Sequence, residues 1–235
     1  MTRVAFQGEP GAYSEAAAIA HYGEAVEPVP CETFEDVFER VTRGQCDRGI
    51  VPIENSLAGS IHQNYDLLLR HDLKITGECI LRVEHCLIAH PETSLEDIRV
   101  VVSHPQALAQ SDRFIRTHQL PREAAYDTAG SVKTIRDTGR RDAAAIASRR
   151  AAVVYGMKIL AENIEDDPNN LTRFLALGRE GVQPEQLEGV PSKTSVVFAL
   201  RNVPGALFRA LSVFAFRDID LTKIESRPIP GKPWE

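Results

Sequence analysis

The sequence repeats one local pattern: a short apolar run, a loop rich in small polar residues, glycine or proline, and then an alanine- and leucine-rich amphipathic segment. Such a run predicts a buried strand, and the segment after the loop has the spacing of a helix. Five strand-to-helix pairs in one chain predict an α/β fold. The pairs run from 3–7 into a helix from Ser14, from 49–53 into a helix ending near Leu69, from 99–103 into 106–115, from 124–127 into 128–135, and from 142–147 into 148–156.

Residues 75–91 interrupt this alternation with two extended segments, and a turn is expected at Pro91. We interpret them as a crossover from one lobe to a second. A late strand, residues 171–178, would return the chain to the first lobe. The crevice between two lobes is the natural place for a ligand, and Thr172 would lie near it.

The composition changes after Gly178. Residues 179–193 carry two prolines and two glycines with few large apolar side chains, which is typical of a linker. A β-rich run at 193–200, a helix at 202–216 with Pro204 in its first turn, and an alternating strand at 218–229 are expected to follow.

Composition and charge limit the classes of function. The chain has 235 residues, 43% of them hydrophobic, which suits one large domain or two lobes with their own cores. A net charge of −6 argues against binding of nucleic acid or an anionic membrane through bulk charge. The N-terminus has no leader pattern and no stretch reaches the ~20 apolar residues of a membrane span, so a cytoplasmic protein is expected.

No residue pattern indicates a metal site. Cys31, Cys46, Cys79 and Cys86 form no CxxC pair and are expected to be reduced thiols. His85 and His90 lack the helical spacing of zinc ligands. The acidic run at 164–170 lacks the alternation and the glycine of a calcium-binding loop, and is expected to be a solvated turn.

The strand-to-helix loops carry the candidate binding groups. Free N–H groups and the dipole at the start of a helix attract anions, so carboxylates can bind there without lysine. A hydrogen bond to a charged group contributes about 1.5–3 kcal/mol, so a few converging donors could hold a small dianion. The candidate donors are Ser14 with the flexible Gly8 and Gly11, Asn55, Ser56 and Ser60, Ser103, His104 and Gln106, and Thr128 and Ser131.

Six segments of the chain, in order, strongly resemble the prephenate dehydratase family: FQGEPGAYSEAA, VPIENSLAGSIHQNYDLLL, SHPQALAQ, YDTAGSVK, AAIASRRAAVVYG and IEDDPNNLTRF. The resemblance covers nearly all of residues 1–180. It implies a two-lobed α/β fold like that of type II periplasmic binding proteins, with the active site in the cleft. It also implies the reaction, in which prephenate loses carbon dioxide and its ring hydroxyl to give phenylpyruvate on the route to phenylalanine, without a cofactor or a metal.

Thr172 is the catalytic residue that the resemblance implies, because the threonine of the family's TRF motif protonates or hydrogen-bonds the departing hydroxyl. A preorganised donor of this kind contributes about 10²- to 10³-fold in rate. Strand alternation turns Arg173 away from Thr172, toward an acid such as Asp166 or a role as an anchor, and returns Phe174 to the pocket wall. The predicted substrate-binding residues are Asn55, Ser56, Ser103, Gln106 and Phe174, with Ser14 and Thr128 as weaker choices.

The tail resembles the start of an ACT domain, the ferredoxin-like βαββαβ module that senses phenylalanine in this family. Only its N-terminal part is present, so an incomplete ACT domain is expected, with a homodimer or homotetramer formed through its open sheet and with uncertain or lost control by L-phenylalanine. The predicted effector-binding residues are Gly205, Ala206, Leu207, Phe208, Glu225, Ser226, Arg227 and Pro228.

The expected domains are a catalytic domain at 1–180, a linker at 181–193 and the partial ACT domain at 194–235. Within the catalytic domain, lobe 1 should hold about 1–76 and 165–180, and lobe 2 about 77–164. Two alternatives stay open. Arogenate dehydratase would perform the same elimination on a substrate with an amino-acid side chain, with Glu54 as the acid near its ammonium group. A nonenzymatic amino-acid or metabolite sensor would use the same architecture.

Overall fold

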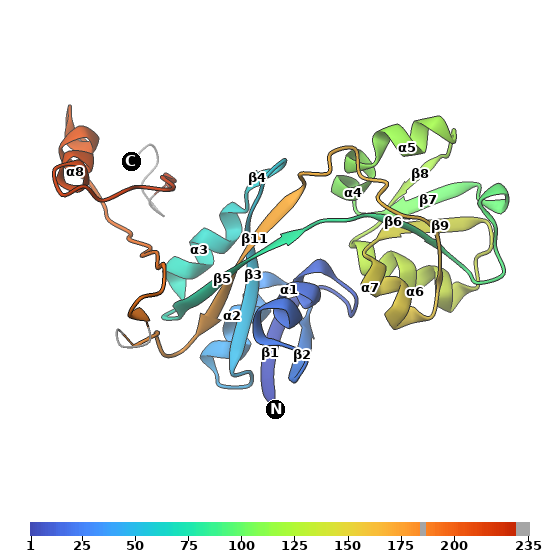
Figure 1. Cartoon of the computed structure of the whole chain (residues 1–235), viewed down its shortest axis with the longest axis horizontal. Coiled ribbons are helices and arrows are strands. Elements are labelled where there is room, and N and C mark those ends of the chain that lie inside the picture. The colour runs from blue at the N-terminus through green and yellow to red at the C-terminus, as the bar shows by residue number, and fades with distance from the viewer. Residues whose placement is uncertain (184–186, 229–235) are drawn as a thin grey trace. The chain divides into compact units, whose positions relative to one another are not determined.

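The computed structural model describes residues 1–183 and 187–228, and the chain divides into two compact units, Met1–Val182 and Gln183–Glu235. Unit 1 holds two sheets, each with helices on both faces (Figure 1). Part of the predicted linker, residues 184–186, and the end of the predicted ACT segment, residues 229–235, lie outside the described residues.

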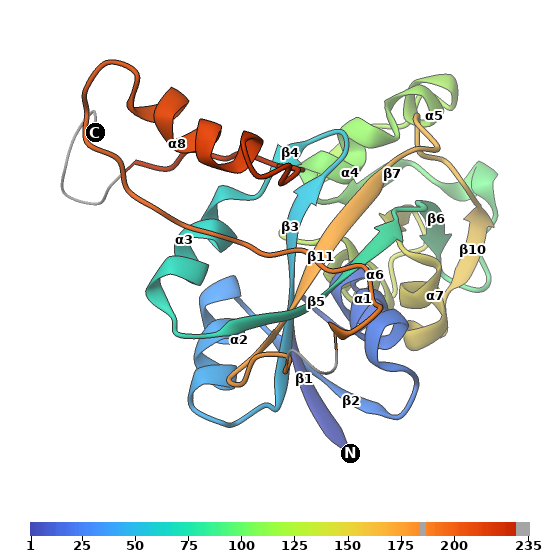
Figure 2. The same cartoon turned by 60° about the vertical axis from the view of Figure 1, so that its left-hand side comes forward.

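The first sheet has the strand order β2-β1-β3-β11-β5, with β4 paired to β3. β1, β2 and β3 are parallel, whereas β11 is antiparallel to both of its neighbours (Figure 2). Its strands are β1 (Thr2–Gln7), β2 (Val26–Cys31), β3 (Arg48–Asn55), β4 (Gly59–Ser60), β5 (Lys74–Arg82) and β11 (Leu171–Gly178), and its helices are α1 (Tyr13–Tyr22), α2 (Phe34–Thr42) and α3 (His62–Arg70).

The second sheet has the strand order β10-β6-β9-β7-β8. β7, β8 and β9 are parallel, and β6 runs antiparallel to β9 and β10. Its strands are β6 (Cys86–Ala89), β7 (Val100–Ser103), β8 (Arg122–Ala124), β9 (Ala143–Ala147) and β10 (Lys158–Ala161). Its helices are the 3₁₀ turn η1 (Leu95–Asp97), α4 (Pro105–Gln110), α5 (Asp112–Thr117), α6 (Thr128–Thr138) and α7 (Arg149–Tyr155).

Apolar side chains from strands and helices build a core on each face of each sheet. α2 and α3 pack on one face of the first sheet, and α1 packs on the other, where Phe6 and Phe174 are buried. In the second sheet, α6 and α7 cover one face and α4 and α5 cover the other. Polar caps start the helices over the second sheet: Asp127 accepts from Gly130 N, and Ser148 accepts from Ala151 N.

The chain crosses between the sheets twice, from β5 into β6 and from β10 into β11 (Figure 1). The two extended segments predicted at 75–91 and the return strand predicted at 171–178 are therefore confirmed. The first lobe extends to Arg82, beyond the boundary predicted near residue 76, because β5 continues as an edge strand along β11. The two-lobed α/β fold class is correct.

A loop between β1 and α1 joins the two lobes. Ser148 Oγ, at the start of α7, donates to Gly11 O at 2.6 Å. Two ion pairs flank this contact: Arg150 to Glu15 at 2.9 Å and Lys133 to Glu9 at 2.9 Å. Gly11 has φ +91°, and a Cβ built there would lie 2.6 Å from Ala151 Cα. Close packing between the lobes therefore requires glycine at this position.

Five elements of unit 1 escape the sequence patterns, among them the short β4 and η1, and one predicted strand is displaced. β2 was not predicted because it contains Pro28 and Pro30, which an edge strand tolerates since one of its sides has no partner. α2 and β10 were also not predicted. The strand predicted at 124–127 ends at Ala124, because Asp127 serves as the cap of α6.

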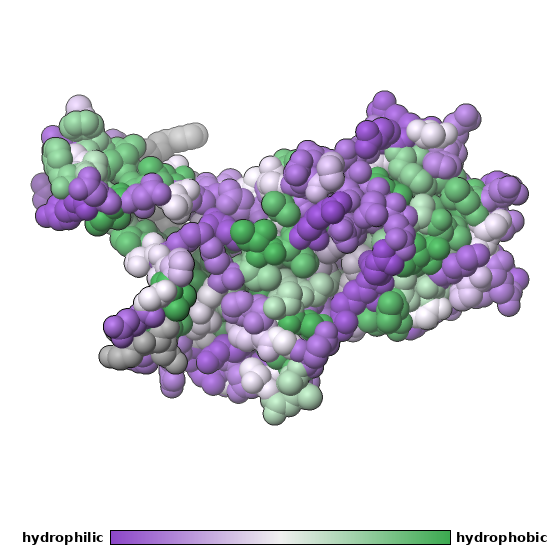
Figure 3. Space-filling view, in the orientation of Figure 1, coloured by the Kyte–Doolittle hydropathy of each residue, from purple (hydrophilic) through white to green (hydrophobic). Residues whose placement is uncertain are grey.

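Of the three elements predicted for unit 2, the helix is present and the two strands are not found among its described residues. The helix exists as α8 (Ala206–Ala215), and Pro204 lies before its first turn rather than within it. The described parts of 193–200 and 218–229 form no strand. A strand needs partners for its backbone groups, and the described residues of unit 2 supply none. Phe198 still packs against Phe214 of α8, and Phe208 on α8 and Phe216 just after it are exposed. The surface of unit 2 accordingly shows apolar patches (Figure 3).

The lobe contact at Gly11 predicts a specific loss of stability. Gly23 has a similar φ of +86°, but a Cβ there would meet nothing within 4 Å. Gly11→Ala should therefore lower the free energy of unfolding by about 1–3 kcal/mol more than Gly23→Ala, because only the former adds a clash to the backbone strain. Urea denaturation of both variants measures the difference, and equal losses would show that the lobes do not meet closely at Gly11.

Candidate active site

Thr172 lies inside the first sheet, where β11 places it opposite Asn55 of β3 and Leu81 of β5. Its side chain is buried, with 8% of its surface exposed. Asn55 Nδ2 donates to Thr172 Oγ1 at 2.9 Å. Among the described residues, none accepts a hydrogen bond from the Thr172 hydroxyl. The oxygen is thus held as an acceptor of the Asn55 amide.

The orientation of the Asn55 amide is fixed by the backbone that follows it. Leu57 N and Ala58 N both donate to Asn55 Oδ1, at 3.0 Å and 2.9 Å. Nδ2 must then face β11, where it also donates to Asn170 Oδ1 at 2.7 Å. Two backbone N–H groups therefore decide which way Asn55 points, and Asn55 in turn decides which way Asn170 points.

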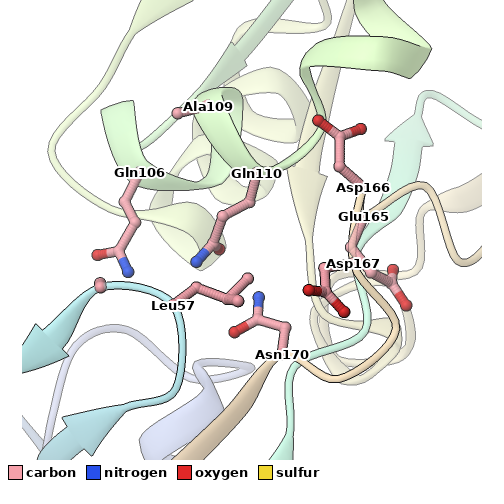
Figure 4. A pocket seen from close by; sticks show the side chains of 9 residues that line it. Leu57, Gln106, Ala109, Gln110, Glu165, Asp166, Asp167 and Asn170 are labelled. Carbon is pink, nitrogen blue, oxygen red and sulfur yellow. The ribbon is translucent and has the colours of Figure 1, made fainter.

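A pocket of about 320 Å³ adjoins this cluster, between the loop after β3, helix α4 and the segment that precedes β11. Asn170 is fully buried at its edge, and its Nδ2 has no hydrogen-bond partner in the described part of the chain. The Asn170 nitrogen is directed into the pocket, toward the amides of Gln106 and Gln110 (Figure 4). The residues that line the pocket are Leu57, Ala58, Gln106, Ala109, Gln110, Glu165, Asp166, Asp167 and Asn170.

A buried histidine orients Gln110. His85 is 1% exposed, and its Nε2 lies 3.0 Å from Gln110 Oε1. The ring contacts the carbonyl end of Gln110, whose amide nitrogen faces the pocket (Figure 4). On the other side of the ring, Tyr13 OH lies 2.8 Å from His85 Nδ1. Burial lowers the pKa of His85 below its usual value, against weaker opposing effects of Gln110 and Glu165, so the ring is neutral near pH 7.

Arg173 pairs with acids of the neighbouring strands. Its guanidinium lies 2.9 Å from Glu54 of β3 and 3.8 Å from Glu78 of β5. It thus anchors the first sheet and does not pair with Asp166, the acid suggested from the sequence. The strand register shifts between Arg173 and Phe174.

The comparisons with known proteins agree on the family. The model of the family described as prephenate dehydratase matches residues 4–182, which is nearly all of unit 1. The chain belongs to the prephenate dehydratase family.

Plant members of this family are similar over nearly the whole chain. The chain is 54% identical to arogenate dehydratase/prephenate dehydratase 2 of Arabidopsis thaliana, a chloroplastic protein, over 98% of its length and 60% of that of the relative. It is also 54% identical to arogenate dehydratase 2 of Petunia hybrida, over 97% of the chain and 57% of that relative. The chain thus spans about three fifths of the length of these proteins.

Two solved structures are similar in fold and sequence. The prephenate dehydratase of Arthrobacter aurescens in complex with L-Phe superposes with a TM-score of 0.85 at 31% identity, over 98% of this chain and 77% of that chain. A protein described as GqqA, a novel type of quorum quenching acylase, gives a TM-score of 0.85 at 34% identity, over 98% and 83%.

The structure brings some of the predicted site residues together. Asn55 and Thr172 share a hydrogen bond, and Gln106 lines the adjoining pocket. Ser56 lies next to them, but its hydroxyl is occupied by the backbone: Oγ donates to Asn169 O at 2.8 Å and accepts from Leu171 N at 2.9 Å. Ser56 therefore holds the start of β11 in place.

Other predicted residues of the family site lie elsewhere. Ser103 is fully buried and donates to Ile146 O at 2.6 Å, so its hydroxyl links β7 to β9. Phe174 lies in the core under α1 rather than in the pocket wall: β11 keeps regular register with β5 from Thr172 to Phe174, but the pocket lies before the start of the strand, at Asn170. Ser14 is buried in the first turn of α1, and Thr128 begins α6; neither lines the pocket.

Sequence reasoning missed Asn170 and Gln110. Asn170 precedes the strand that carries Thr172, and its alternation with Thr172 was a usable signal, since residues i and i+2 face the same side of a strand. Gln110 lies one helical turn after Gln106, which also indicated a shared face. What the sequence could not show is that a buried histidine would orient Gln110.

The predicted effector-binding residues all belong to unit 2. Gly205 precedes α8 with φ +74°, and Ala206, Leu207 and Phe208 form its first turn. Glu225 to Pro228 follow in an irregular segment, where Lys223 and Glu225 form an ion pair at 3.6 Å. Binding of phenylalanine by these residues stays a prediction.

Within 1–183 and 187–228, no cluster of three or more histidine, cysteine or acidic side chains could hold a metal ion. In the same ranges no helix has both the length and the apolar character needed to cross a bilayer. All four cysteines are unpaired thiols.

The neutral state of His85 predicts a pH dependence of stability. The unfolded chain binds a proton near the usual pKa of 6.5, whereas the folded chain resists protonation until lower pH. The free energy of unfolding should therefore fall as pH drops below about 6.5, with a slope of at most about 1.4 kcal/mol per pH unit from this group. Urea denaturation between pH 7.5 and 5.5 measures the slope, and His85→Gln should reduce it; an unchanged slope in the variant would contradict the assignment.

Proposed function

We propose that unit 1 catalyses the decarboxylating dehydration of a ring-hydroxylated cyclohexadiene carboxylate, as its family name indicates. The observation that carries this proposal is the hydroxyl of Thr172, which accepts from the Asn55 amide. Thr172 does not itself line the pocket, but Asn55 links it to Asn170, whose amide nitrogen points into the pocket. Family membership supports the same reaction.

The reaction needs orientation and charge stabilisation more than a strong acid. The bond between the ring and its carboxylate breaks and releases carbon dioxide, and the electron pair enters the ring. The bond from the ring to the hydroxyl then breaks, and the oxygen leaves as water after gaining a proton. A hydrogen bond from Thr172 stabilises the charge that develops on the departing oxygen, and the burial of this side chain protects the bond from water. Formation of the aromatic ring drives the reaction.

Two substrates fit this chemistry, prephenate and arogenate. Prephenate would give phenylpyruvate, and arogenate would give phenylalanine directly. The name of the similar Arabidopsis protein includes both activities, and the Petunia protein is named for arogenate alone. Because the chain covers about three fifths of these relatives, their activity comes to it as part of the proposal. The chloroplast location belongs to the Arabidopsis protein, and a cytoplasmic location stays a prediction for this chain.

The neighbourhood of Thr172 predicts the effect of removing its hydroxyl. Thr172→Val keeps the shape of the side chain and should lower kcat by about 10²- to 10³-fold, because the departing oxygen loses its donor. Substrate affinity should change little, since the amide donors of the pocket remain. Steady-state assays with both substrates, and calorimetric titration of the variant, measure the two effects; Thr172→Ser should recover part of the turnover.

A variant that keeps near-normal turnover would remove Thr172 from the mechanism. A protein that binds either compound but turns over neither in its unmodified form would instead be the sensor predicted as the alternative.

The Asn55 amide gives a second prediction. In Asn55→Asp, the carboxylate oxygen that replaces Nδ2 cannot donate, so the Thr172 hydroxyl should turn its proton toward the new carboxylate and away from the substrate. Turnover per folded molecule should fall at least about tenfold, since a charge-assisted bond of about 1.5–3 kcal/mol competes for the proton. Steady-state kinetics at neutral pH measure the loss.

Asn64→Asp is the matched control. Asn64 is also fully buried, and its Nδ2 donates to Pro52 O at 2.6 Å, at a different point of β3 and without contact to Thr172. It should lose stability but keep turnover per folded molecule. Equal loss of turnover in both variants would mean that a general weakening of β3 is the cause.

A further inference from the structure

The three acids that line the pocket differ in what surrounds their carboxylates. Glu165 is almost fully buried, with Arg82 at 3.1 Å from one oxygen and His85 N donating to the other at 2.9 Å. Asp166 accepts from Arg113 N at the start of α5, and its carboxylate turns away from the pocket (Figure 4). Both are occupied by the protein itself.

Asp167 is the exception. Its Oδ1 accepts from Asn169 N at 2.8 Å, and among the described residues no lysine, arginine or histidine pairs with it. Its carboxylate lies at the pocket beside Asn170 (Figure 4). One negative charge is thus left without a cation at the wall of a pocket that a metabolite can enter.

Asn170 beside Asp167, and Gln106 and Gln110 across the pocket, present donors. Asn170 Nδ2 is buried, has no partner among residues 1–183 and 187–228 and is directed into the pocket, where an acceptor on a ligand can complete it. Gln110 presents its amide nitrogen from α4, and Gln106 lies beside it. Amide donors opposite one free carboxylate are complementary to a ligand that carries both a carboxylate and an ammonium group.

Glu54 is the acid that the sequence analysis named as a partner for an ammonium group, but its carboxylate is already paired within the protein. Arg173 lies 2.9 Å from its carboxylate, so its charge is already compensated within the sheet. A keto acid would gain nothing from Asp167, because it carries no cation to offset the repulsion between Asp167 and the side-chain carboxylate that both substrates share. An amino acid would gain an ion pair at the same place.

We propose that Asp167 binds the ammonium group of the substrate side chain, and that it thereby makes unit 1 select arogenate over prephenate. This inference rests on the proposed function, because it takes the pocket beside Thr172 to be the place where the side chain of the substrate binds. The choice between the two substrates would then depend on Asp167, a residue that lies outside the strands and helices of the fold.

The test compares kcat/KM for arogenate and prephenate in the full chain. Asp167→Asn keeps the acceptor for Asn169 N and removes the charge. It should lower kcat/KM for arogenate by about 10- to 100-fold and leave that for prephenate within about threefold or raise it. Asp167→Glu restores the charge and should recover part of the preference for arogenate.

Asp166→Asn is the comparator, because it removes the same charge from the neighbouring residue, whose carboxylate accepts from Arg113 N. The ratio of the two kcat/KM values should stay at the wild-type level there. A ratio that is unchanged in folded Asp167→Asn, or that changes equally in both variants, overturns the assignment.

Failure of the proposed function would be recognised separately. If the wild-type chain turns over neither compound, calorimetric titration with arogenate and with prephenate tests the same residue. Affinity for arogenate that is lost in Asp167→Asn would still support the assignment, and the absence of arogenate binding in the wild type would overturn it.

Discussion

The side-chain amide of Asn55 is the interaction on which the site depends. It connects β3, which lies early in the chain, to the return segment and β11, which lie more than a hundred residues later. Its oxygen is held by the two N–H groups of the turn that follows β3, so the amide cannot rotate without loss of these bonds. Asn170 and Thr172 take their orientation from it. The backbone turn after β3 therefore sets the orientation of both the Thr172 hydroxyl and the Asn170 amide.

The two lobes serve this arrangement in different ways. The first lobe supplies the fixed part, since β3, β11 and β5 are adjacent strands, and Arg173 pairs across them with Glu54. The second lobe supplies α4, whose glutamines face the pocket, and His85, which sets the direction of one of them. The loop at Gly11 holds the lobes together at a different place. The sequence suggested that this loop binds an anion, yet its backbone groups bond to Ser148 and Glu15.

Much of this fold could be predicted from the sequence, since four of the five strand-to-helix pairs and the return strand follow directly from apolar periodicity. β2 escaped because two prolines mask a strand that lies at an edge. The tail strands were predicted from local alternation, but a strand also needs a neighbour, which no single stretch of sequence can supply. The site was harder. Ser103 and Gln106 looked equivalent as donors in one loop, and only the tertiary structure shows that the former bonds to Ile146 while the latter faces the pocket.

The position of β11 also affects the order in which the molecule can form. It is the last strand of unit 1 in the chain, yet it lies between β3 and β5, which are made much earlier. All strands of the second lobe have left the ribosome soon after Ala161 has been added, so that lobe can fold during synthesis as a continuous segment. In the first lobe, β11 cannot take its place between β3 and β5 until the chain has been synthesised to Gly178. Thr172, the proposed catalytic residue, therefore lies on the strand that completes the sheet. A nascent chain has no assembled site before its first lobe is complete.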